Sequence, residues 1–232
     1  MKERLNKIIA KSGFCSRRKA DELISQGKVK VNQIIISELG TQADPNKDRI
    51  LINNTPLKLE KKLYILLHKP KGYITTTKDV HAEKTVLDLL PDIFARVYPV
   101  GRLDKDSCGL LILTNDGNLS YKLTHPKFEI DRIYEVSMKN PLQPSTIKKI
   151  EKGGINIEDY KTSPCKIRII RREKTKTKIR LILHEGRKRE IRKIFALFDH
   201  PVIELKRIQF GKLKLGDLEP GKFRYLKKKE IL

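Results

Sequence analysis

The sequence predicts an α+β protein of two parts, a small helix-helix-strand domain and a larger domain with a mainly antiparallel mixed sheet. Helical spacing of apolar residues is concentrated near the start of the 232-residue chain, and the remainder holds many strand-like segments and few helices. Residues 53–62 (NNTPLKLEKK) are polar and contain Pro56, which is typical of a linker or an exposed turn. We therefore expect domains at residues 1–60 and 61–232.

The first domain is expected to open with two helices. Apolar residues recur at helical spacing between residues 3 and 10, with basic residues on another face. A second helix is expected to begin at Ser16, a residue type that caps helix N-termini, and to stop at Gly27. The segment KVKVNQIII, residues 28–36, then has the composition of a strand.

The second domain is expected to begin with strands. The stretch LYILLHKPKGYITT, residues 63–76, holds two β-rich runs around a Pro and Gly turn, and residues 85–94 are a helix candidate. The later strand candidates are YPVGRL, CGLLILT, RIYEVSM, CKIRIIRR and KIRLILHEG, and the helix candidates are residues 117–124, 144–152 and 187–199.

The charge balance points to a polyanionic partner. Lys and Arg number 51 against 28 Asp and Glu, so the formal net charge is +23. Arg17, Arg18 and Lys19 cluster in the first turn of the second predicted helix, where basic side chains oppose the helix dipole. Contact with phosphates supplies a reason for them to be there. Charge alone does not distinguish nucleic acid from an anionic membrane surface.

Other sequence signals favour a protein that stays in the cytoplasm and has no metal. Cys15, Cys108 and Cys165 lie far apart and form no metal-ligand spacing, so we expect reduced thiols. The longest apolar run, residues 108–113, is too short to span a bilayer, and the N-terminal MKERLNK lacks the apolar region of a signal peptide. We expect no membrane association.

An acidic loop stands out in this basic chain. The stretch GRLDKDSCGLLILTNDG, residues 101–117, carries Asp104, Asp106 and Asp116 around an apolar run. Asp116 precedes a glycine in a common turn pair, and Asp106 is interpreted as a loop acid. The residue types leave Asp104 open between a catalytic carboxylate and a salt-bridged loop aspartate, and a pair of acids also allows a glycosidase.

Two further segments could complete a site. In LHEGRKREIRKIFALF, residues 183–198, apolar residues recur at helical spacing while Arg189, Arg192 and Lys193 share a neighbouring face. A guanidinium there could orient a buried carboxylate and lower its pKa, although a solvated basic helix is the usual explanation of such a run taken by itself. Tyr134 in DRIYEVS is either an ordinary strand tyrosine or a ring that stacks on an unstacked base.

Several of these segments resemble known families. The stretch RLNKIIAKSGFCSRRKADELISQGKVKVNQ resembles the S4 RNA-binding domain. The segments GRLDKDSCGLLILTNDG, DRIYEV, LHKPKGYITT and LHEGRKREIRKIFALFDHPVIELKRIQFGKLKLGDLEPGKFRYL resemble the ribosomal-RNA pseudouridine synthases. Within that family, the similarity is to the group formed by synthase A for small-subunit rRNA and synthases B, E and F for large-subunit rRNA. The form GRKREIR is most similar to synthase B.

The resemblance implies a reaction and roles for residues. It implies that Asp104 is the catalytic carboxylate, that Tyr134 stacks on the target uracil, that Arg192 pairs with Asp104, and that Leu205 packs near the base. The residues expected to bind RNA are Arg4, Lys7, Arg17, Arg18, Lys19, Arg102, Arg187 and Arg189. Asp104 would either attack C1′ or remove the proton at C2′.

The implied activity is site-specific isomerisation of uridine to pseudouridine in ribosomal RNA, with 23S rRNA favoured. Its partners would be ribosomal RNA or a ribosomal precursor particle, it would need no cofactor, and we expect a monomer. One alternative is a non-catalytic RNA-binding or ribosome-assembly factor on the same fold. Another is a nucleoside glycosidase that uses Asp104 with Asp106 and releases free uracil.

Overall fold

A computed structural model describes residues 1–77, 84–90, 93 and 95–231. The chain forms two compact units. Unit 1 comprises Met1–Leu63 with the short segments Ile93–Val97 and Asn115–Gly117, and unit 2 comprises the remainder. The part of the molecule described includes no helix long and apolar enough to cross a membrane.

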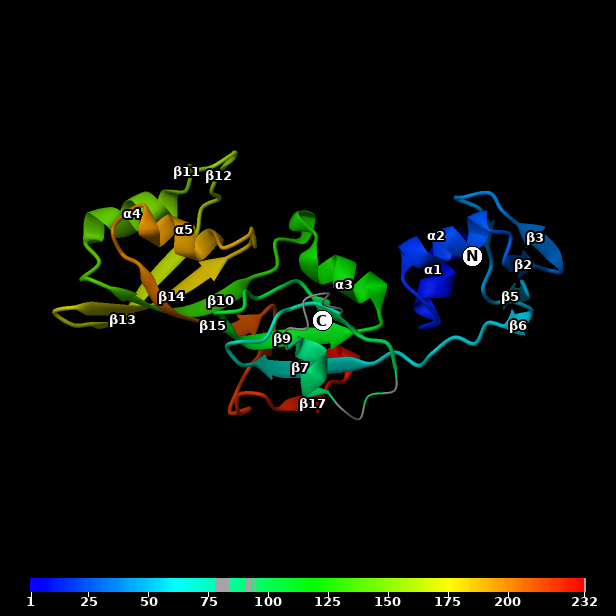
Figure 1. The fold of residues 1–232 in the computed structure, drawn as a ribbon. Coiled ribbons are helices and arrows are strands. Elements are labelled where there is room, and N and C mark those ends of the chain that lie inside the picture. Colours follow the sequence, from blue (N-terminus) through cyan, green and yellow to red (C-terminus); the bar gives the residue numbers. More distant parts are fainter. Residues whose placement is uncertain (78–83, 91–92, 94, 232) are drawn as a thin grey trace. The chain divides into compact units, whose positions relative to one another are not determined.

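Unit 1 contains two helices and short antiparallel strands (Figure 1). Its elements are β1 (Glu3–Arg4), α1 (Leu5–Lys11), α2 (Arg17–Ser25), β2 (Val29–Val31), β3 (Ile34–Ile36), β4 (Gln42–Ala43), β5 (Ile50–Ile52) and β6 (Thr55–Pro56). The strands form a sheet in the order β3-β2-β5-β6 and a separate pair β1-β4. Apolar residues from both helices and from β2 and β5 form its core.

The start of α2 confirms the predicted cap. The Ser16 hydroxyl accepts a hydrogen bond from the Lys19 backbone N–H at 3.1 Å, so one of the unpaired donors of the first turn is satisfied. The single strand expected over residues 28–36 is wrong, because β2 and β3 are two strands of a hairpin. Asn32 and Gln33 have φ values of 51° and 70°, and two consecutive positive φ angles match the twist of a tight hairpin.

Unit 2 is built on a sheet that, within the described residues, has nine strands. The main path runs β13-β14-β10-β15-β9-β7-β17, while β8 pairs with β9 and β16 with β15. The strands are β7 (Tyr64–Lys69), β8 (Tyr98–Val100), β9 (Cys108–Thr114), β10 (Arg132–Lys139), β13 (Lys166–Arg172), β14 (Lys176–Leu183), β15 (Val202–Phe210), β16 (Leu213–Lys214) and β17 (Phe223–Tyr225). Each of these pairings is antiparallel except β15 with β9, so the predicted α+β class with a mainly antiparallel mixed sheet is confirmed.

Helices cover the sheet of unit 2, and α4 and α5 lie on the same face of the β13-β14-β10 half (Figure 1). The helices are α3 (Gly117–Thr124), α4 (Pro144–Lys152) and α5 (Glu190–Ala196), with the 3-10 turns η1 (Val86–Leu89), η2 (Pro126–Phe128) and η3 (Lys228–Glu230). A small hairpin pairs β11 (Asn156–Ile157) with β12 (Tyr160–Lys161).

Three predicted elements are shorter than expected. The helix predicted at 187–199 spans only Glu190–Ala196, because Arg189 adopts a left-handed φ of 54° and the segment before it is a loop. The helix predicted at 85–94 is the turn η1, and its residues 91, 92 and 94 lie outside the described residues. The second β-rich run of residues 63–76 makes a single bridge, from Ile74 to Thr85.

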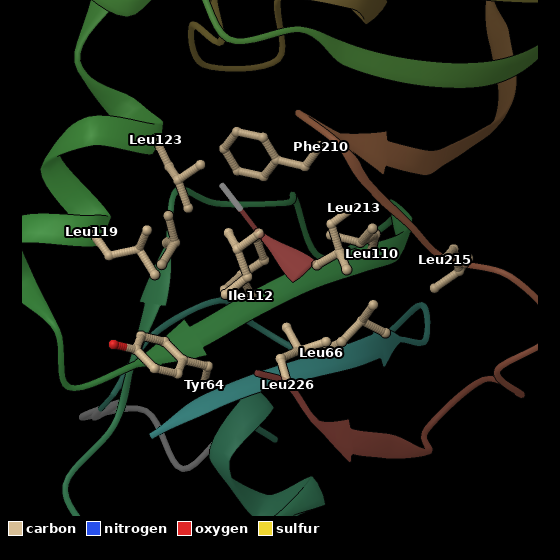
Figure 2. Packing of buried hydrophobic residues seen from close by; sticks show 12 residues of the cluster. Tyr64, Leu66, Leu110, Ile112, Leu119, Leu123, Phe210, Leu213, Leu215 and Leu226 are labelled. Carbon is tan, nitrogen blue, oxygen red and sulfur yellow. The ribbon is translucent and has the colours of Figure 1, made fainter. Parts of the chain in front are cut away.

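The core that supports the site lies between α3 and strands β7 and β9. Figure 2 shows Leu119 and Leu123 of α3 directed toward a cluster that includes Leu66, Leu110 and Ile112. All six residues of β7 are buried, as are six of the seven of β9, so both strands are covered on both faces. This buried pair gives the loop that precedes β9 a rigid base.

Candidate active site

The loop between β8 and β9 carries Asp104. It begins at Gly101, whose φ of 72° is a turn conformation that side chains rarely adopt, and it ends where Cys108 enters β9. The Ser107 N–H donates to the Asp104 carbonyl at 3.0 Å, which closes a tight turn around the catalytic candidate. The loop sequence therefore places Asp104 at the turn, with its side chain free to leave the backbone.

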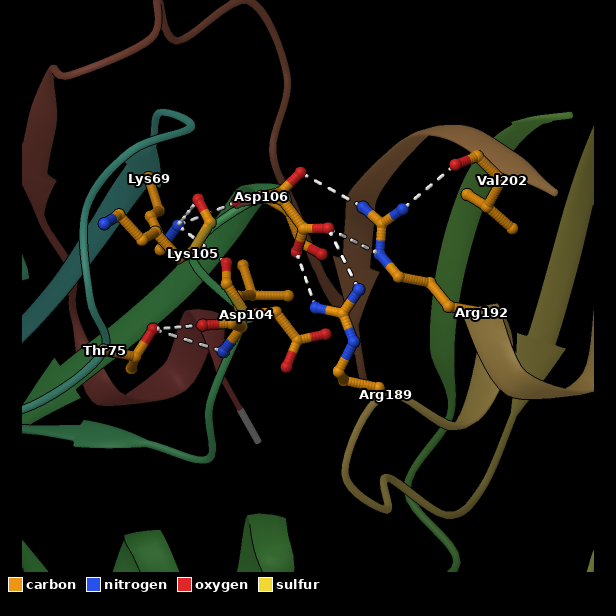
Figure 3. Close-up of polar contacts among 10 residues, drawn as sticks. Lys69, Thr75, Asp104, Lys105, Asp106, Arg189, Arg192 and Val202 are labelled. Atoms are coloured by element: carbon orange, nitrogen blue, oxygen red, sulfur yellow. Dashed lines mark hydrogen bonds and ion pairs between the residues drawn. The ribbon is translucent and has the colours of Figure 1, made fainter. Parts of the chain in front are cut away.

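Lys69 anchors this loop from the buried strand β7. Its side chain is 0% exposed, and its ammonium donates to the carbonyls of Asp104 at 3.0 Å and Ser107 at 2.8 Å (Figure 3). Burial lowers the pKa of Lys69 to about 8. A lysine at the end of the apolar run YILLHK is a signal that sequence reasoning missed, since a buried ammonium requires several acceptors.

Thr75 holds the other side of the loop. Its hydroxyl donates to the Leu103 carbonyl at 2.6 Å and accepts from the Leu103 N–H at 3.2 Å. The Gly72 N–H adds a hydrogen bond to the Lys105 carbonyl at 2.8 Å. Because these bonds and those of Lys69 act on consecutive residues of the loop, the Asp104 backbone is held in one conformation.

Asp104, Tyr134 and Leu205 line one cavity of 490 Å³. Tyr134 comes from β10 and is 6% exposed, and Leu205 comes from β15 and is 5% exposed. In the sheet register Leu205 opposes Val136, two residues from Tyr134, so the two side chains project from the same face. The structure therefore brings together three residues that lie 30 or more positions apart in the sequence.

The expected pairing of Arg192 with Asp104 is wrong. The Arg192 guanidinium instead lies 3.1 Å from the Asp106 carboxylate and donates to the carbonyls of Asp106 and Val202, each at 3.1 Å (Figure 3). In the described part of the chain, no side chain donates a hydrogen bond to the Asp104 carboxylate. Arg192 is therefore held by groups from the loop and from β15.

Asp106 clamps the loop to the start of α5. Besides its contact with Arg192, the Asp106 carboxylate accepts hydrogen bonds from both terminal nitrogens of Arg189, at 3.2 and 3.3 Å. Burial raises the pKa of the Asp106 carboxyl, but the Arg189 hydrogen bonds and the Arg192 charge outweigh it, so the pKa lies below its usual value. Asp106, interpreted from the sequence as a loop acid, thus has a structural role: it fixes the loop against Arg189 and Arg192.

Asp116 lies directly before α3 and is 3% exposed. Its carboxylate lies 3.1 Å from the Lys62 ammonium. Asp116 lies between a strand and a helix and is not among the residues that line the cavity, which is consistent with its interpretation as a turn residue.

Basic residues surround the cavity and occur separately on unit 1. Arg102, Arg187 and Arg189 line the cavity and are exposed. On unit 1, Lys7 is paired with Glu3 at 3.1 Å and Lys19 with Glu22 at 2.6 Å. The exposed basic residues of unit 1 among the predicted RNA contacts are Arg4, Arg17, Arg18 and Lys19.

A pair of neighbouring carboxyl groups, buried Glu190 and half-buried Glu185, forms another part of the cavity wall, and sequence reasoning missed it. Glu190, 3% exposed, accepts a hydrogen bond from the Arg187 N–H at 3.2 Å. Burial and the neighbouring Glu185 raise the pKa of Glu190 to about 7. Glu185 accepts from the Ser163 N–H at 2.6 Å and keeps a pKa below its usual value. The pair therefore fixes the loop between β14 and α5.

This arrangement suits the binding of a base. A carboxylate lies in a cavity whose other walls include an aromatic ring and aliphatic side chains. Within the described residues, no cluster of His, Cys, Asp or Glu is arranged to hold a metal ion. The cavity can accept a flat aromatic ring while basic side chains at its rim contact an anionic backbone.

Comparison with known proteins defines the family. Residues 63–197 match the family model described as RNA pseudouridylate synthase, and residues 3–50 match the S4 domain model. The chain belongs to the RNA pseudouridylate synthase family, and it is therefore an isomerase that converts uridine in RNA to pseudouridine. The predicted family and enzyme class are confirmed.

Individual relatives match over almost the whole chain. Ribosomal large subunit pseudouridine synthase B of Bacillus subtilis is 43% identical over 231 residues, which cover 99% of this chain and 94% of that protein. An uncharacterized RNA pseudouridine synthase of Aquifex aeolicus is 40% identical and covers 100% and 93%. A crystal structure of a pseudouridylate synthase superposes with a TM-score of 0.71 at 29% identity and covers 98% and 97%.

Proposed function

We propose that this enzyme isomerises a specific uridine of large-subunit ribosomal RNA and that Asp104 is its catalytic carboxylate. The observation that carries the proposal is the position of Asp104. It lines the cavity that also contains Tyr134 and Leu205, and it lies on a loop held by Lys69 and Thr75. The large-subunit target follows from the similarity to the Bacillus subtilis enzyme.

The reaction needs one carboxylate because the uracil is both leaving group and returning nucleophile. The N1–C1′ bond breaks, the uracil turns within the cavity, and a C5–C1′ bond forms. The C5 proton is lost and N1 gains one, so the product is an isomer of the substrate. No water has to be activated, which distinguishes this site from that of an inverting glycosidase.

Tyr134 and Leu205 supply the surfaces that hold the detached base. Their near-complete burial keeps water from the cavity floor, and excluded water cannot hydrolyse the intermediate. Extruding the uridine from its stack costs about a few kcal/mol. Stacking on Tyr134 and contacts of Arg102, Arg187 and Arg189 with the RNA backbone offset this cost.

We further propose that residues 1–60 act as an RNA-binding domain that retains the substrate, and that the enzyme is a monomer. The match of residues 3–50 to the S4 domain and the exposed Arg17 and Arg18 support the first statement. The ligand of the whole enzyme is then ribosomal RNA or a precursor particle, with no cofactor.

Replacement of Asp104 tests the catalytic proposal. We expect Asp104→Asn to fold as the parent and to lose at least about 10³-fold in rate, because the amide cannot act as nucleophile or base. Asp159→Asn, an exposed acid in the β11–β12 turn, is the matched control and should keep the parental rate. Pseudouridine is mapped in parallel in transcripts of large-subunit rRNA and of small-subunit rRNA.

Each outcome of this assay bears on one part of the proposal. Full activity of Asp104→Asn would remove Asp104 from the chemistry, and modification of only the small-subunit transcript would overturn the target. Free uracil in place of C5-linked uridine would show that the detached base escapes rather than returning to C1′.

A further inference from the structure

A second cavity of 890 Å³ adjoins the candidate active site and shares six lining residues with it, including Tyr134. Its volume lies in the range of ligand-binding pockets. Five cations contribute to its lining, whereas Glu129 and Glu185 are the acids among the lining residues. The cations are Arg102, Arg132, Lys166, Arg187 and Arg207.

Two of these cations are buried arginines that lie against the same ring. Arg207 is 2% exposed and Arg132 is 9% exposed. Their guanidinium carbons each lie 5.0 Å from the centroid of Phe210. Burial lowers the pKa of Arg132, and the charge of Arg207 lowers it further, so the two positive charges repel each other.

The backbone satisfies these arginines only in part. Arg132 donates to the carbonyls of His184 at 2.6 Å and Leu123 at 3.3 Å. Arg207 donates from Nε to the Leu110 carbonyl at 2.8 Å, but its buried Nη2 has no hydrogen-bond partner in the described part of the chain. A buried guanidinium nitrogen without an acceptor costs about 1–3 kcal/mol.

Carboxylates do not compensate the two charges. Neither arginine makes a salt bridge with any described residue, and Glu185 is already engaged by Arg187 and by the Ser163 N–H. Glu190 lies near enough to favour the charged form of Arg132, but its own raised pKa of about 7 leaves it partly protonated at neutral pH. A buried pair of cations without a counterion is complementary to an anion.

We propose that the second cavity binds a backbone phosphate of the substrate RNA next to the target uridine, through Arg207 and Arg132. This inference rests on the proposed function, because it assumes that the target uridine occupies the cavity lined by Asp104. The sheet register places Arg207 directly opposite Tyr134, and side chains opposite each other on neighbouring strands are in contact range. The ring that stacks on the uracil and the guanidinium that holds its phosphate are then adjacent.

A phosphodiester fits this site better than a base. Guanidinium groups bind phosphate oxygens through paired charge-assisted hydrogen bonds, and the free Nη2 of Arg207 provides a donor. Holding the phosphate beside an extruded nucleotide also fixes the backbone in the unstacked conformation. Arg207 is therefore assigned as a substrate-positioning residue.

The test uses fluorescently labelled pentauridylate and fluorescence anisotropy, with all variants in an Asp104→Asn background so that binding is separated from turnover. Arg207→Gln is expected to weaken binding about tenfold and to reduce the slope of log affinity on log salt by about 0.7, the value for one phosphate contact of a single strand. Arg207→Lys, which keeps the charge, should restore most of the slope. Lys174→Ala, an exposed cation in the β13–β14 turn, is the control.

A second probe identifies the phosphate as the ligand. With a pentauridine whose linkages are neutral methylphosphonates, Arg207→Gln and its parent should bind equally. A persisting difference would overturn the assignment, as would an unchanged slope for Arg207→Gln with pentauridylate. If inorganic phosphate binds in a way that depends on Arg207 but does not displace pentauridylate, the site belongs to a free anion and the assignment is also overturned.

Folding and the proposed function are controlled separately. If Arg207→Gln melts below the assay temperature, Lys166→Ala at the exposed rim of the same cavity replaces it and should reduce the slope in the same direction. An unchanged slope for Lys166→Ala then counts against the proposal. Retained activity of Asp104→Asn would end the catalytic assignment but would leave this binding comparison intact.

Discussion

Lys69 illustrates how a single buried residue determines the geometry of the candidate site. Its ammonium is surrounded by backbone carbonyls of the Asp104 loop, including Ser107 at 2.8 Å. Each carbonyl that loses a donor in a buried position costs about 1–3 kcal/mol, so the loop conformation and the lysine stabilise each other. Asp106 performs the corresponding task on the exposed side through Arg189 and Arg192.

Glu190 makes the stability of the enzyme depend on pH. Its pKa of about 7 in the folded protein exceeds its ordinary value of 4.5, so the folded state keeps a proton that the unfolded state loses. The associated stabilisation is fully present below pH 4.5 and is lost as the pH rises through 7. We expect Glu190→Gln, which stays neutral, to melt higher than the parent at about pH 8 and to show a smaller difference at about pH 5.

Thermal melting at the two pH values measures this difference. Glu219→Gln, an exposed glutamate of unit 2, should shift the melting temperature by the same small amount at both. A pH-independent effect of Glu190→Gln would contradict the raised pKa.

At the scale of elements, the site depends on the single parallel pairing of the described sheet. β9 pairs with β15 through Cys108 with Lys206 and Gly109 with Arg207. A Cβ on Gly109 would lie 2.3 Å from the Arg207 carbonyl oxygen and 2.6 Å from its nitrogen. The two strands can approach this closely only because residue 109 has no side chain, and the approach places β15, with Leu205, beside the Asp104 loop.

Gly109→Ala is therefore expected to destabilise unit 2 by about 2–4 kcal/mol and to lower activity, because the clash is with backbone and the φ of 110° is unfavourable for alanine. Gly216→Ala separates the two causes. Gly216 also has a positive φ, 62°, but a Cβ there meets nothing within 4 Å, so only about 1 kcal/mol of conformational strain is expected. Denaturant unfolding measures both, and equal losses would show that the strand approach is not limiting.

At the scale of the whole molecule, the net charge of +23 is distributed over both units. Unit 1 exposes Arg17 and Arg18 at the start of α2, and the cavity of unit 2 is rimmed by Arg102 and Arg187. Each phosphate contact releases counterions, so affinity for RNA should fall steeply with salt. The proposal that residues 1–60 retain the substrate then has a measurable signature.

We expect the double variant Arg17→Ala and Arg18→Ala to weaken binding of an rRNA transcript. Each phosphate that no longer meets an arginine should reduce the salt slope by about 0.7–0.9. Lys47→Ala with Arg49→Ala, exposed cations outside α2, removes the same charge and should reduce the slope less. An equal reduction in the two double variants would indicate a general charge effect rather than a binding site at α2.

The sequence by itself determined the features that depend on neighbouring residues. The Ser16 cap, the alternating burial of β10 and the fold class follow from interactions within a few residues, and so could be predicted. The family motifs, including the loop of Asp104 and the strand of Tyr134, could likewise be recognised in the sequence because each is a contiguous stretch.

Only the tertiary structure decided which of these motifs meet. Arg192 binds Asp106, 86 residues away, and Arg207 lies against β9, whose Leu110 is 97 residues away. The hairpin turn at Asn32 and the late start of α5 were also missed. Asparagine adopts a positive φ more readily than most residues, so Asn32 carried a local turn signal that was overlooked. The positive φ of Arg189 has no such local signal and is imposed by pairing and packing. The packing of strands that are distant in sequence determines which charged side chains meet. It brings Arg189 and Arg192 to Asp106, while Asp104 lines the cavity.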